Sequence, residues 1–288
     1  MPIVLEKNIE SQLESITVLD LKEKHFDPNW HFHPHYQLFT VLKGTGTRFI
    51  GDNIQHFEEG DTVFLGPNLP HLWRSDKQYF DADSKDSTHG IVLYFSEDFL
   101  GENFFEKPEM KPLKVLLENS KRGIYWSDNL KEKVIDFLKE IPAVFGFERV
   151  LKLLELLHSL SQNTDFKYIT NPDYANSYKI SETERMQKVY DFVSQSFKEN
   201  IKLNEIADKV NMTEAAFCRY FKKRTNKTFV DFVNEIRIGN ACKLLKNKEM
   251  SIAEIAFESG FNTMSNFHFQ FKKVTSQTPN AYLKANIH

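Results

Sequence analysis

The chain has 288 residues, of which 41% are hydrophobic and 27% are charged, and its formal net charge is −3. This length exceeds the usual size of one domain, so we expect two domains, each with its own core, and the composition excludes a disordered chain. No run of eighteen apolar residues occurs and the first residues lack the features of a secretory signal, which predicts a cytoplasmic protein without a membrane segment. Cys218 and Cys242 have no metal-ligand spacing, so we expect reduced thiols and no disulfide framework.

Short β-rich runs fill the region from about Tyr36 to Phe95. They read YQLFTVLK, TRFIG, DTVFLG and HGIVLYF, and Gly, Pro, Asn and Asp turn signals separate them. Short strands with regular turns are typical of a β-sandwich or β-barrel. From Leu113 onward the apolar residues recur at spacings of three and four, in KVLLEN, LKEKVIDFLKEI and ERVLKLLELLHSL, which predicts helices.

The last of these predicted helices has a wide apolar stripe, which suits packing on the barrel first and pairing with a second subunit next. Its members are Phe147, Val150, Leu151, Leu154, Leu157 and Leu160. The segment that follows, DFKYITNPDYANSYKIS, contains Pro172 and several Asn, Asp and Ser residues and has no hydrophobic period. We therefore predict a linker over residues 165–181, between a first domain of residues 1–164 and a second domain of residues 182–288.

The net charge is divided unequally between the two parts of the chain. Residues 1–180 carry 20 Lys and Arg against 28 Asp and Glu, a balance of −8, whereas residues 181–288 carry 17 against 12, a balance of +5. A basic part that meets phosphate, joined to an acidic sensor or dimerisation part, would have this distribution. Ordinary variation in surface charge is the alternative.

The basic part contains an internal repeat. Ile206-Ala207 recurs as Ile255-Ala256, 49 residues later. Six further positions recur 50 residues later, where Phe217, Phe221, Lys222, Lys223, Thr225 and Thr228 match Phe267, Phe271, Lys272, Lys273, Thr275 and Thr278. Each copy predicts a short helix, a tight turn and a second helix whose Phe pair at i and i+4 faces the first helix. The repeat therefore predicts two helix-turn-helix units.

A helical solenoid would also repeat pairs of helices, but solenoids need three or more copies to bury a continuous core. Between the two copies a helical pattern runs from about Phe229 to Leu245, and about 17 residues of helix span about 26 Å. This length would hold the two units apart by about one turn of DNA. We therefore expect contacts in two adjacent major grooves.

The basic part of the chain resembles a known protein family. The segments IADKVNMTEAAFCRYFKK, RIGNACKLL, SIAEIAFESGFNTMSNFHFQFKK and TPNAYL are similar to the DNA-binding domain of the AraC/XylS family, over about residues 182–286. The resemblance implies a transcriptional regulator whose recognition helices, about Glu214–Arg224 and Met264–Lys273, enter successive major grooves. By matching positions it implies DNA contacts by Ala215, Cys218, Arg219, Lys222 and Lys223 in the first helix, and by Met264, Ser265, Asn266, Phe269, Lys272 and Lys273 in the second.

Arg219 is the strongest candidate for direct readout, because a guanidinium can bond to both O6 and N7 of guanine, and Asn266 could pair with adenine. The lysine pairs are expected at phosphates, with solvated lysines as the alternative. Two positions depart from the family pattern. Phe269 stands where arginine is common, so the second helix either contacts thymine methyl groups or adds little specificity. Lys202 replaces the usual Ser or Thr cap, which predicts a weaker start for the helix that contains Ile206.

The segment WHFHPHYQLFTVLKG places His31, His33, His35 and Gln37 at alternate positions, hence on one face if the strand is regular. Together with GDTVFLGPNLPHLW, which contains His71, it resembles the paired motifs of a cupin barrel. In metal-binding cupins these motifs supply three histidines and a glutamate. Here the glutamate position holds Gln37, a poorer ligand that cannot neutralise charge.

Regulators similar to this chain use the barrel to bind a small effector, often a sugar. The effector-binding residues that this implies are His31, His33, Gln37, Arg48, His71 and Trp73. One alternative is a divalent transition metal held by His31, His33 and His71, and another is a purely structural role for the histidines. The effector pocket is the first hypothesis, and it requires no cofactor or metal.

The sequence thus predicts an α+β, two-domain protein, with an N-terminal cupin-like β-barrel and its following helices, and a C-terminal all-α domain with two helix-turn-helix units. We expect an effector-responsive transcriptional regulator and not an enzyme. Its expected partners are double-stranded DNA and a small effector, with RNA polymerase and a second copy of the chain as further candidates. The alternatives are a metal-dependent cupin oxygenase or isomerase with a helical accessory domain, and a constitutive DNA-binding protein whose barrel only dimerises.

Overall fold

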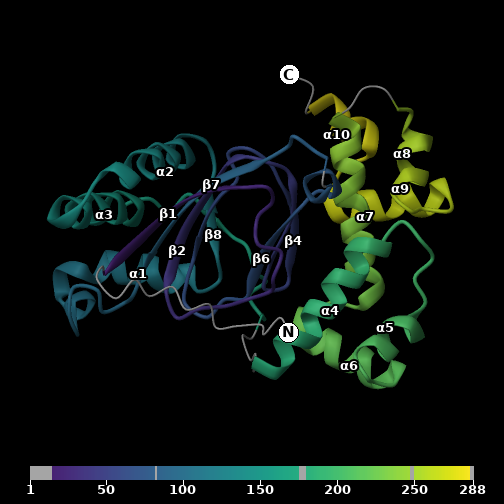
Figure 1. Ribbon diagram of the computed structural model, residues 1–288, viewed down its shortest axis with the longest axis horizontal. Helices are drawn as coiled ribbons and strands as arrows, with labels where there is room; N and C mark the ends of the chain where they lie inside the picture. Colours follow the sequence, from purple (N-terminus) through teal and green to yellow (C-terminus); the bar gives the residue numbers. More distant parts are fainter. Residues whose placement is uncertain (1–14, 82, 175–179, 247–249, 286–288) are drawn as a thin grey trace. The chain divides into compact units, whose positions relative to one another are not determined.

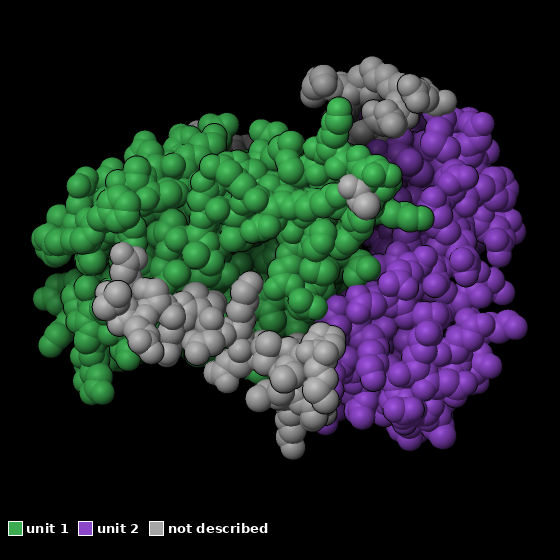
Figure 2. Space-filling model, viewed as in Figure 1, with its two compact units in different colours: residues 1–53, 57–176 green, residues 54–56, 177–288 purple. Residues whose placement is uncertain are grey.

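The computed structural model describes residues 15–81, 83–174, 180–246 and 250–285. The chain divides into two compact units, residues 1–53 with 57–176 and residues 177–288 with 54–56 (Figure 2). Strands followed by helices build the first unit, and helices build the second over residues 180–246 and 250–285 (Figure 1). This arrangement confirms the predicted fold class.

Two sheets form the β part of the first unit. A six-stranded sheet has the strand order β1-β7-β2-β5-β8-β9, and a three-stranded sheet has the order β4-β3-β6. The strands are β1 Ile16–Glu23, β2 Tyr36–Lys43, β3 Gly46–Ile50, β4 Asn53–Phe57, β5 Thr62–Leu65, β6 His71–Ser75, β7 Thr88–Phe95, β8 Ile124–Trp126 and β9 Phe166–Tyr168. The four runs read from the sequence are β2, β3, β5 and β7. Strand β1 adds an antiparallel partner to β7 over its full length.

Three helices cover one side of the larger sheet, with β4 and β6 on its other side (Figure 1). They are α1 Lys111–Ser120, α2 Asp128–Glu140 and α3 Gly146–Ser161. Alternate residues of β2 serve the two sides, because successive side chains of a strand point to opposite faces. Tyr36 and Leu38 pack in the core with the helices, whereas Phe39 and Val41 pack in the core with the smaller sheet. Burial on both faces explains why apolar residues occur on both faces of this strand, whose first six residues are all buried.

The predicted apolar stripe of α3 is wrong in part. Leu157 and Leu160 are buried as expected, but Phe147 is 73% exposed and Leu151 is 44% exposed. The helix buries Leu153 and Leu156 in their place. The helix has six leucines and two further apolar residues in 16 positions, so its apolar face is wider than the surface that packs against the core. The sequence pattern therefore does not show which part of that face is buried. Pairing of two chains through the exposed residues stays a prediction.

The predicted linker is also wrong at its start. Strand β9 pairs antiparallel with β8, Ile169 is 5% exposed, and Asn171 bonds through its side-chain nitrogen to the Asp52 carboxylate at 2.7 Å. Residues 166–171 therefore complete the first unit. A three-residue strand is too short to show a period, which explains the error. The remaining part of the predicted boundary includes residues 175–179, which lie outside the described residues.

The second unit consists of seven helices within the described residues. They are α4 Ile180–Ser196, α5 Leu203–Lys209, α6 Glu214–Thr225, α7 Phe229–Lys246, α8 Ile252–Glu258, α9 Met264–Thr275 and α10 Pro279–Ala285. The central helix α7 packs on both repeats. Its first turn places Phe232 against Phe221, with ring centroids 5.1 Å apart, and its second half places Ile238 and Ala241 in the core around Phe267. Helix α7 thus joins the two predicted helix-turn-helix units, α5–α6 and α8–α9.

Candidate functional site

Helix α6 presents one face to the core and another to solvent. Its start is capped by Thr213, whose hydroxyl oxygen accepts from the backbone nitrogen of Ala216 at 3.3 Å. Phe217 and Phe221, one turn apart, are fully buried. Five of the predicted DNA-contacting residues are exposed on this helix: Ala215, Cys218, Arg219, Lys222 and Lys223. The helix therefore offers a basic outer face over a phenylalanine-rich inner face.

Helix α9 repeats this construction. Thr263 caps it by accepting from the backbone nitrogen of Asn266 at 3.3 Å, and Phe267 and Phe271 are fully buried. Met264 is partly buried, and the other predicted contact residues are exposed: Ser265, Asn266, Phe269, Lys272 and Lys273. Phe269 is 65% exposed although it lies between the two buried phenylalanines. The structure thus brings the predicted residues of each recognition helix onto its exposed side.

The two copies also end alike. Thr225 and Thr275 donate their hydroxyls to the carbonyls of Phe221 and Phe271, at 2.9 and 2.8 Å. The next residue in each copy, Asn226 in the first, has a left-handed backbone that ends the helix. Equivalent caps at both ends mean that equivalent positions along α6 and α9 point in equivalent directions.

The helices that precede α6 and α9 begin differently. Ser251 and Glu254 form a reciprocal capping box, with the Ser251 nitrogen donating to the Glu254 carboxylate at 2.7 Å. At Lys202 the backbone nitrogen lies 3.5 Å from the Glu205 carboxylate, and a lysine side chain cannot accept the return bond. The first copy therefore keeps only the glutamate half of the box, as the missing Ser or Thr predicts.

The turn within the second copy requires Gly260. Its φ is +86°, and an added Cβ would lie 2.8 Å from the carbonyl oxygen of Phe197. Asn211 has the equivalent place in the first copy, with φ +54°. Asparagine tolerates the left-handed region better than most residues, and glycine has no Cβ to clash, so each turn has a residue suited to it.

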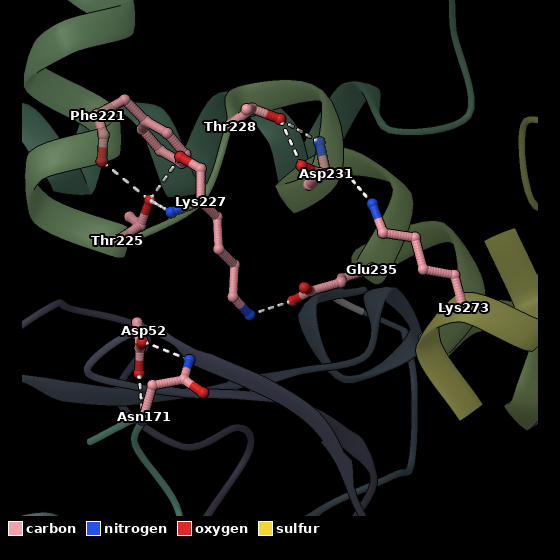
Figure 3. Close-up of polar contacts among 9 residues, drawn as sticks. All are labelled: Asp52, Asn171, Phe221, Thr225, Lys227, Thr228, Asp231, Glu235 and Lys273. Atoms are coloured by element: carbon pink, nitrogen blue, oxygen red, sulfur yellow. Dashed lines mark hydrogen bonds and ion pairs between the residues drawn. The ribbon is translucent and has the colours of Figure 1, made fainter. Parts of the chain in front are cut away.

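Polar contacts tie α9 to the start of α7 (Figure 3). The Lys273 ammonium lies 2.5 Å from a carboxylate oxygen of Asp231, whose other oxygen accepts from the Thr228 hydroxyl at 2.7 Å. Hydrogen bonds from Lys273 and Thr228 lower the pKa of Asp231. Lys227 and Glu235 form a second ion pair at 2.6 Å. The phosphate contact predicted for Lys273 therefore competes with an ion pair, which the sequence did not reveal.

A second cluster lies in the β-barrel of the first unit, where three of the predicted histidines converge. His31, His33 and His71 are buried, and one ring nitrogen of each lies within 4.8 Å of those of the other two. In each ring Nδ1 contacts a backbone carbonyl, which only accepts, so Nδ1 carries a proton, and in a neutral ring the lone pair is then on Nε2. The carbonyls belong to Asn29, His35 and Leu69, at 2.7, 3.0 and 2.7 Å respectively.

His35 does not join this cluster. The chain bends between His33 and Tyr36, and β2 begins only at Tyr36, so the expected regular strand through all four alternate positions is wrong. Pro34 explains the bend, because it removes a backbone donor and fixes φ. Gln37 does lie beside His33, with its amide oxygen 2.9 Å from Nε2. Nε2 of neutral His33 has no proton and needs a donor. Turning the Gln37 amide over would place its NH₂ group there.

Burial lowers the pKa of His33 to about 3, with the charge of His31 as the next cause. The ring is therefore neutral at physiological pH. Tyr94, which the sequence analysis missed, lies across the His33 ring with centroids 5.1 Å apart, and burial raises its pKa. The alternation of β7 could have predicted this position, because Tyr94 lies two residues after Val92 and therefore on the same, inward face of the strand.

The remaining predicted effector residues lie near this cluster on the smaller sheet. Trp73 contacts His71 edge to face, with centroids 5.6 Å apart, and is the cross-strand partner of Arg48. Arg48 is 3% exposed, and its Nε lies 3.4 Å from the Asp61 carboxylate. A buried cation, an indole and three imidazoles thus line the inside of the barrel.

Comparison with known proteins gives matches to both units. Residues 206–285 match the family model of a helix-turn-helix domain, and residues 17–79 match that of a cupin domain. The chain is 24% identical to YdeC of Bacillus subtilis, an uncharacterized HTH-type transcriptional regulator, over 89% of this chain and 86% of that protein. It is 20% identical to the HTH-type transcriptional activator RhaR of Mannheimia succiniciproducens over 92% and 91%, and 23% identical to the Msm operon regulatory protein of Streptococcus mutans over 96% and 97%.

Two helix-turn-helix units with exposed recognition helices, preceded by a cupin barrel, define a DNA-binding transcriptional regulator. The order of these two domains, and the relatives that match over most of their length, indicate which type of transcriptional regulator this is. These two domains and these relatives bear out the resemblance to AraC-type transcriptional regulators that the sequence predicted. Within the described residues, no helix is long and apolar enough to cross a membrane.

Proposed function

We propose that the chain binds a two-part site on double-stranded DNA through the exposed faces of α6 and α9. The observation that supports this proposal most is the structural repeat, in which two helices share their caps, their buried phenylalanine pair and their outward positions. The 18 residues of α7 span about 27 Å, and the units packed on its two ends can extend this to the about 34 Å of one turn of DNA. Each helix then contacts one of two successive major grooves.

The exposed residues of α6 divide into two roles in this proposal. Arg219 reads a base, because its fork of donors matches the O6 and N7 acceptors of guanine. Lys222 and Lys223 contact phosphates, which position the protein without reading sequence. In α9 Lys272 takes the same role, and Lys273 orients α9 against α7 through Asp231.

Selection of bound sequences from a random DNA pool by the full chain tests this proposal. We expect a motif with two conserved blocks about one helical turn apart, of which Arg219→Ala degrades one block and leaves the other. Loss of a bidentate guanine contact costs about 1–3 kcal/mol of discrimination. Lys284→Ala, which removes an exposed positive charge from α10, is the control and should leave both blocks intact. Selection without any motif would remove the proposal.

We further propose that a small molecule bound inside the barrel alters DNA binding, without catalysis. The polar groups on the inner face support this, since Arg48, Gln37 and the histidines offer donors and acceptors within an aromatic wall. A ligand shifts an equilibrium only by its different affinity for the two states. The effector must therefore contact groups whose positions differ between the DNA-competent and incompetent arrangements.

A divalent transition metal is the second candidate occupant, because three imidazoles with Nδ1 fixed by carbonyls have the donor set and outer contacts of a metal site. His31, His33 and His71 would hold it through Nε2. A bound metal would supply a Lewis-acidic centre that an oxygen-rich effector could join. Gln37 would leave the charge of such a site uncompensated, which favours nitrogen-preferring metals over harder ones.

Titration of chelator-treated full chain with Co²⁺, followed by its visible absorption, tests the metal. We expect one Co²⁺ per chain, displaced by Zn²⁺. Loss of an outer-shell partner weakens metal binding about 10–100-fold. His71→Ala removes a ligand itself and should weaken Co²⁺ binding by more than this. His89→Ala is the control, at a partly exposed histidine of β7 that pairs with Asp20 of β1. No saturable absorption would exclude the metal and leave the effector proposal standing.

A further inference from the structure

The internal repeat places Phe269 at the same position on α9 that Arg219 has on α6. Each lies two residues after the first buried phenylalanine of its helix and two before the second. The caps that start the two helices are equivalent, since Thr213 and Thr263 each accept from the nitrogen three residues later at 3.3 Å. The two side chains therefore project from equivalent points of the two recognition helices.

The surroundings of Phe269 match those of a base-reading residue. It is 65% exposed, and its neighbours on the same helix face are polar. Ser265 and Asn266 lie one turn before it and Lys272 lies three residues after it, all exposed. A single exposed aromatic ring is common on protein surfaces, so its exposure alone decides nothing. Phe269 has the same position in the repeat as Arg219, and this equivalence is the observation that assigns it to the DNA-facing side of α9.

We propose that Phe269 selects thymine by packing on the C5-methyl group, where Arg219 selects guanine in the other half of the site. Thymine is the base that presents an apolar group in the major groove, and a phenyl ring can offer it only apolar contact. This inference rests on the proposed function. It makes the two halves of the DNA site unlike each other, so that one chain binds its site in a single orientation.

The first test is the same selection by the full chain with Phe269→Arg. We expect the thymine in the second block to change to guanine, with a preference of about 10-fold, while the first block stays unchanged. Phe257→Arg is the matched control, because Phe257 is 58% exposed but lies on α8, outside the recognition helices. It should keep the original motif. The circular dichroism of both variants checks that the exposed substitutions leave the helices intact.

The second test removes only the methyl group. Replacing the selected thymine by deoxyuridine should weaken binding of the unmodified chain about fourfold, the effect of losing one buried methyl group. Phe269→Ala should bind the two DNAs equally, whereas Phe257→Ala should still distinguish them. Equal binding of thymine and uracil sites by the unmodified chain, or an unchanged motif with Phe269→Arg, would overturn the inference. Absence of any motif in the unmodified chain would instead overturn the proposed function.

Discussion

Replacing Phe267 by alanine is expected to destabilise the second helix-turn-helix unit by about 3–5 kcal/mol, the usual cost of truncating a buried phenylalanine. The ring is fully buried, and it contacts Phe261 and Phe271 with centroids 5.4 and 5.5 Å apart. The apolar core of this unit is small, since short helices α8 and α9 close on one half of α7. The cavity that the missing Phe267 ring leaves in this core cannot be filled by side chains from elsewhere in the chain.

Phe269→Ala removes the same atoms two residues further along the same helix and is the matched control. Its ring is 65% exposed, so we expect the free energy of unfolding to change by about 0.5 kcal/mol or less. The two variants therefore separate stability from DNA recognition. Phe267→Ala should lose DNA binding through unfolding, and Phe269→Ala should change selectivity in a folded protein.

Two spectroscopic probes distinguish the units in a urea titration of the full chain. Trp30, Trp73 and Trp126 are the three tryptophans of the sequence and all lie in the first unit, so their fluorescence follows that unit. Far-ultraviolet circular dichroism follows the helices, many of which lie in the second. We expect Phe267→Ala to lower the midpoint of the dichroism transition and to leave the fluorescence transition in place. Equal effects of the two alanine variants would contradict the assignment of inner and outer faces.

The helix-turn-helix repeat was predictable because its signals are local and occur twice. Phe217 and Phe221 recur as Phe267 and Phe271, and a spacing of four residues places each pair on one helix face whatever the tertiary structure. The ion pair between Lys273 and Asp231 was not predictable. It joins residues 42 apart in sequence on two different helices, and no periodic pattern encodes such a pairing.

The barrel was predictable as a set of strands and less so in its details. The runs that became β2, β5 and β7 are apolar on both faces, which the short β-rich segments showed. The alternating pattern does not show the bend at Pro34, so it places His35 on the same strand face as His31 and His33, whereas His35 stays outside the cluster. The three histidines that do converge come from two segments about 40 residues apart, and only the resemblance to paired cupin motifs brought them together at the sequence level.

Lowering the pH is expected to destabilise the first unit through His33, in protein freed of metal by chelation. Burial holds the pKa of the folded His33 at about 3, whereas an unfolded histidine has a pKa of about 6.5. Between these values the unfolded state binds the proton and the folded state does not. The stabilisation is therefore complete above pH 6.5 and is lost as the pH falls towards 3, by about 1.4 kcal/mol per pH unit, or about 2 kcal/mol at pH 5. The groups that face His33 are His31, His35, Gln37, His71 and Tyr94, and none of them is a carboxylic acid that could offset the charge.

Urea titrations of the full chain at pH 7.5, 6 and 5, followed by tryptophan fluorescence, measure this dependence. His33→Gln keeps a polar side chain but cannot gain a proton, so its stability should fall less steeply by about 1.4 kcal/mol per pH unit below 6.5. The difference in slope, not in absolute stability, is the relevant quantity, because the substitution also changes the packing against Tyr94. His89→Gln makes the same substitution at a partly exposed histidine of β7, outside the cluster, and is the matched control. Parallel curves for His33→Gln and the unmodified chain would mean that the barrel admits water to His33 and leaves its proton affinity near the unfolded value.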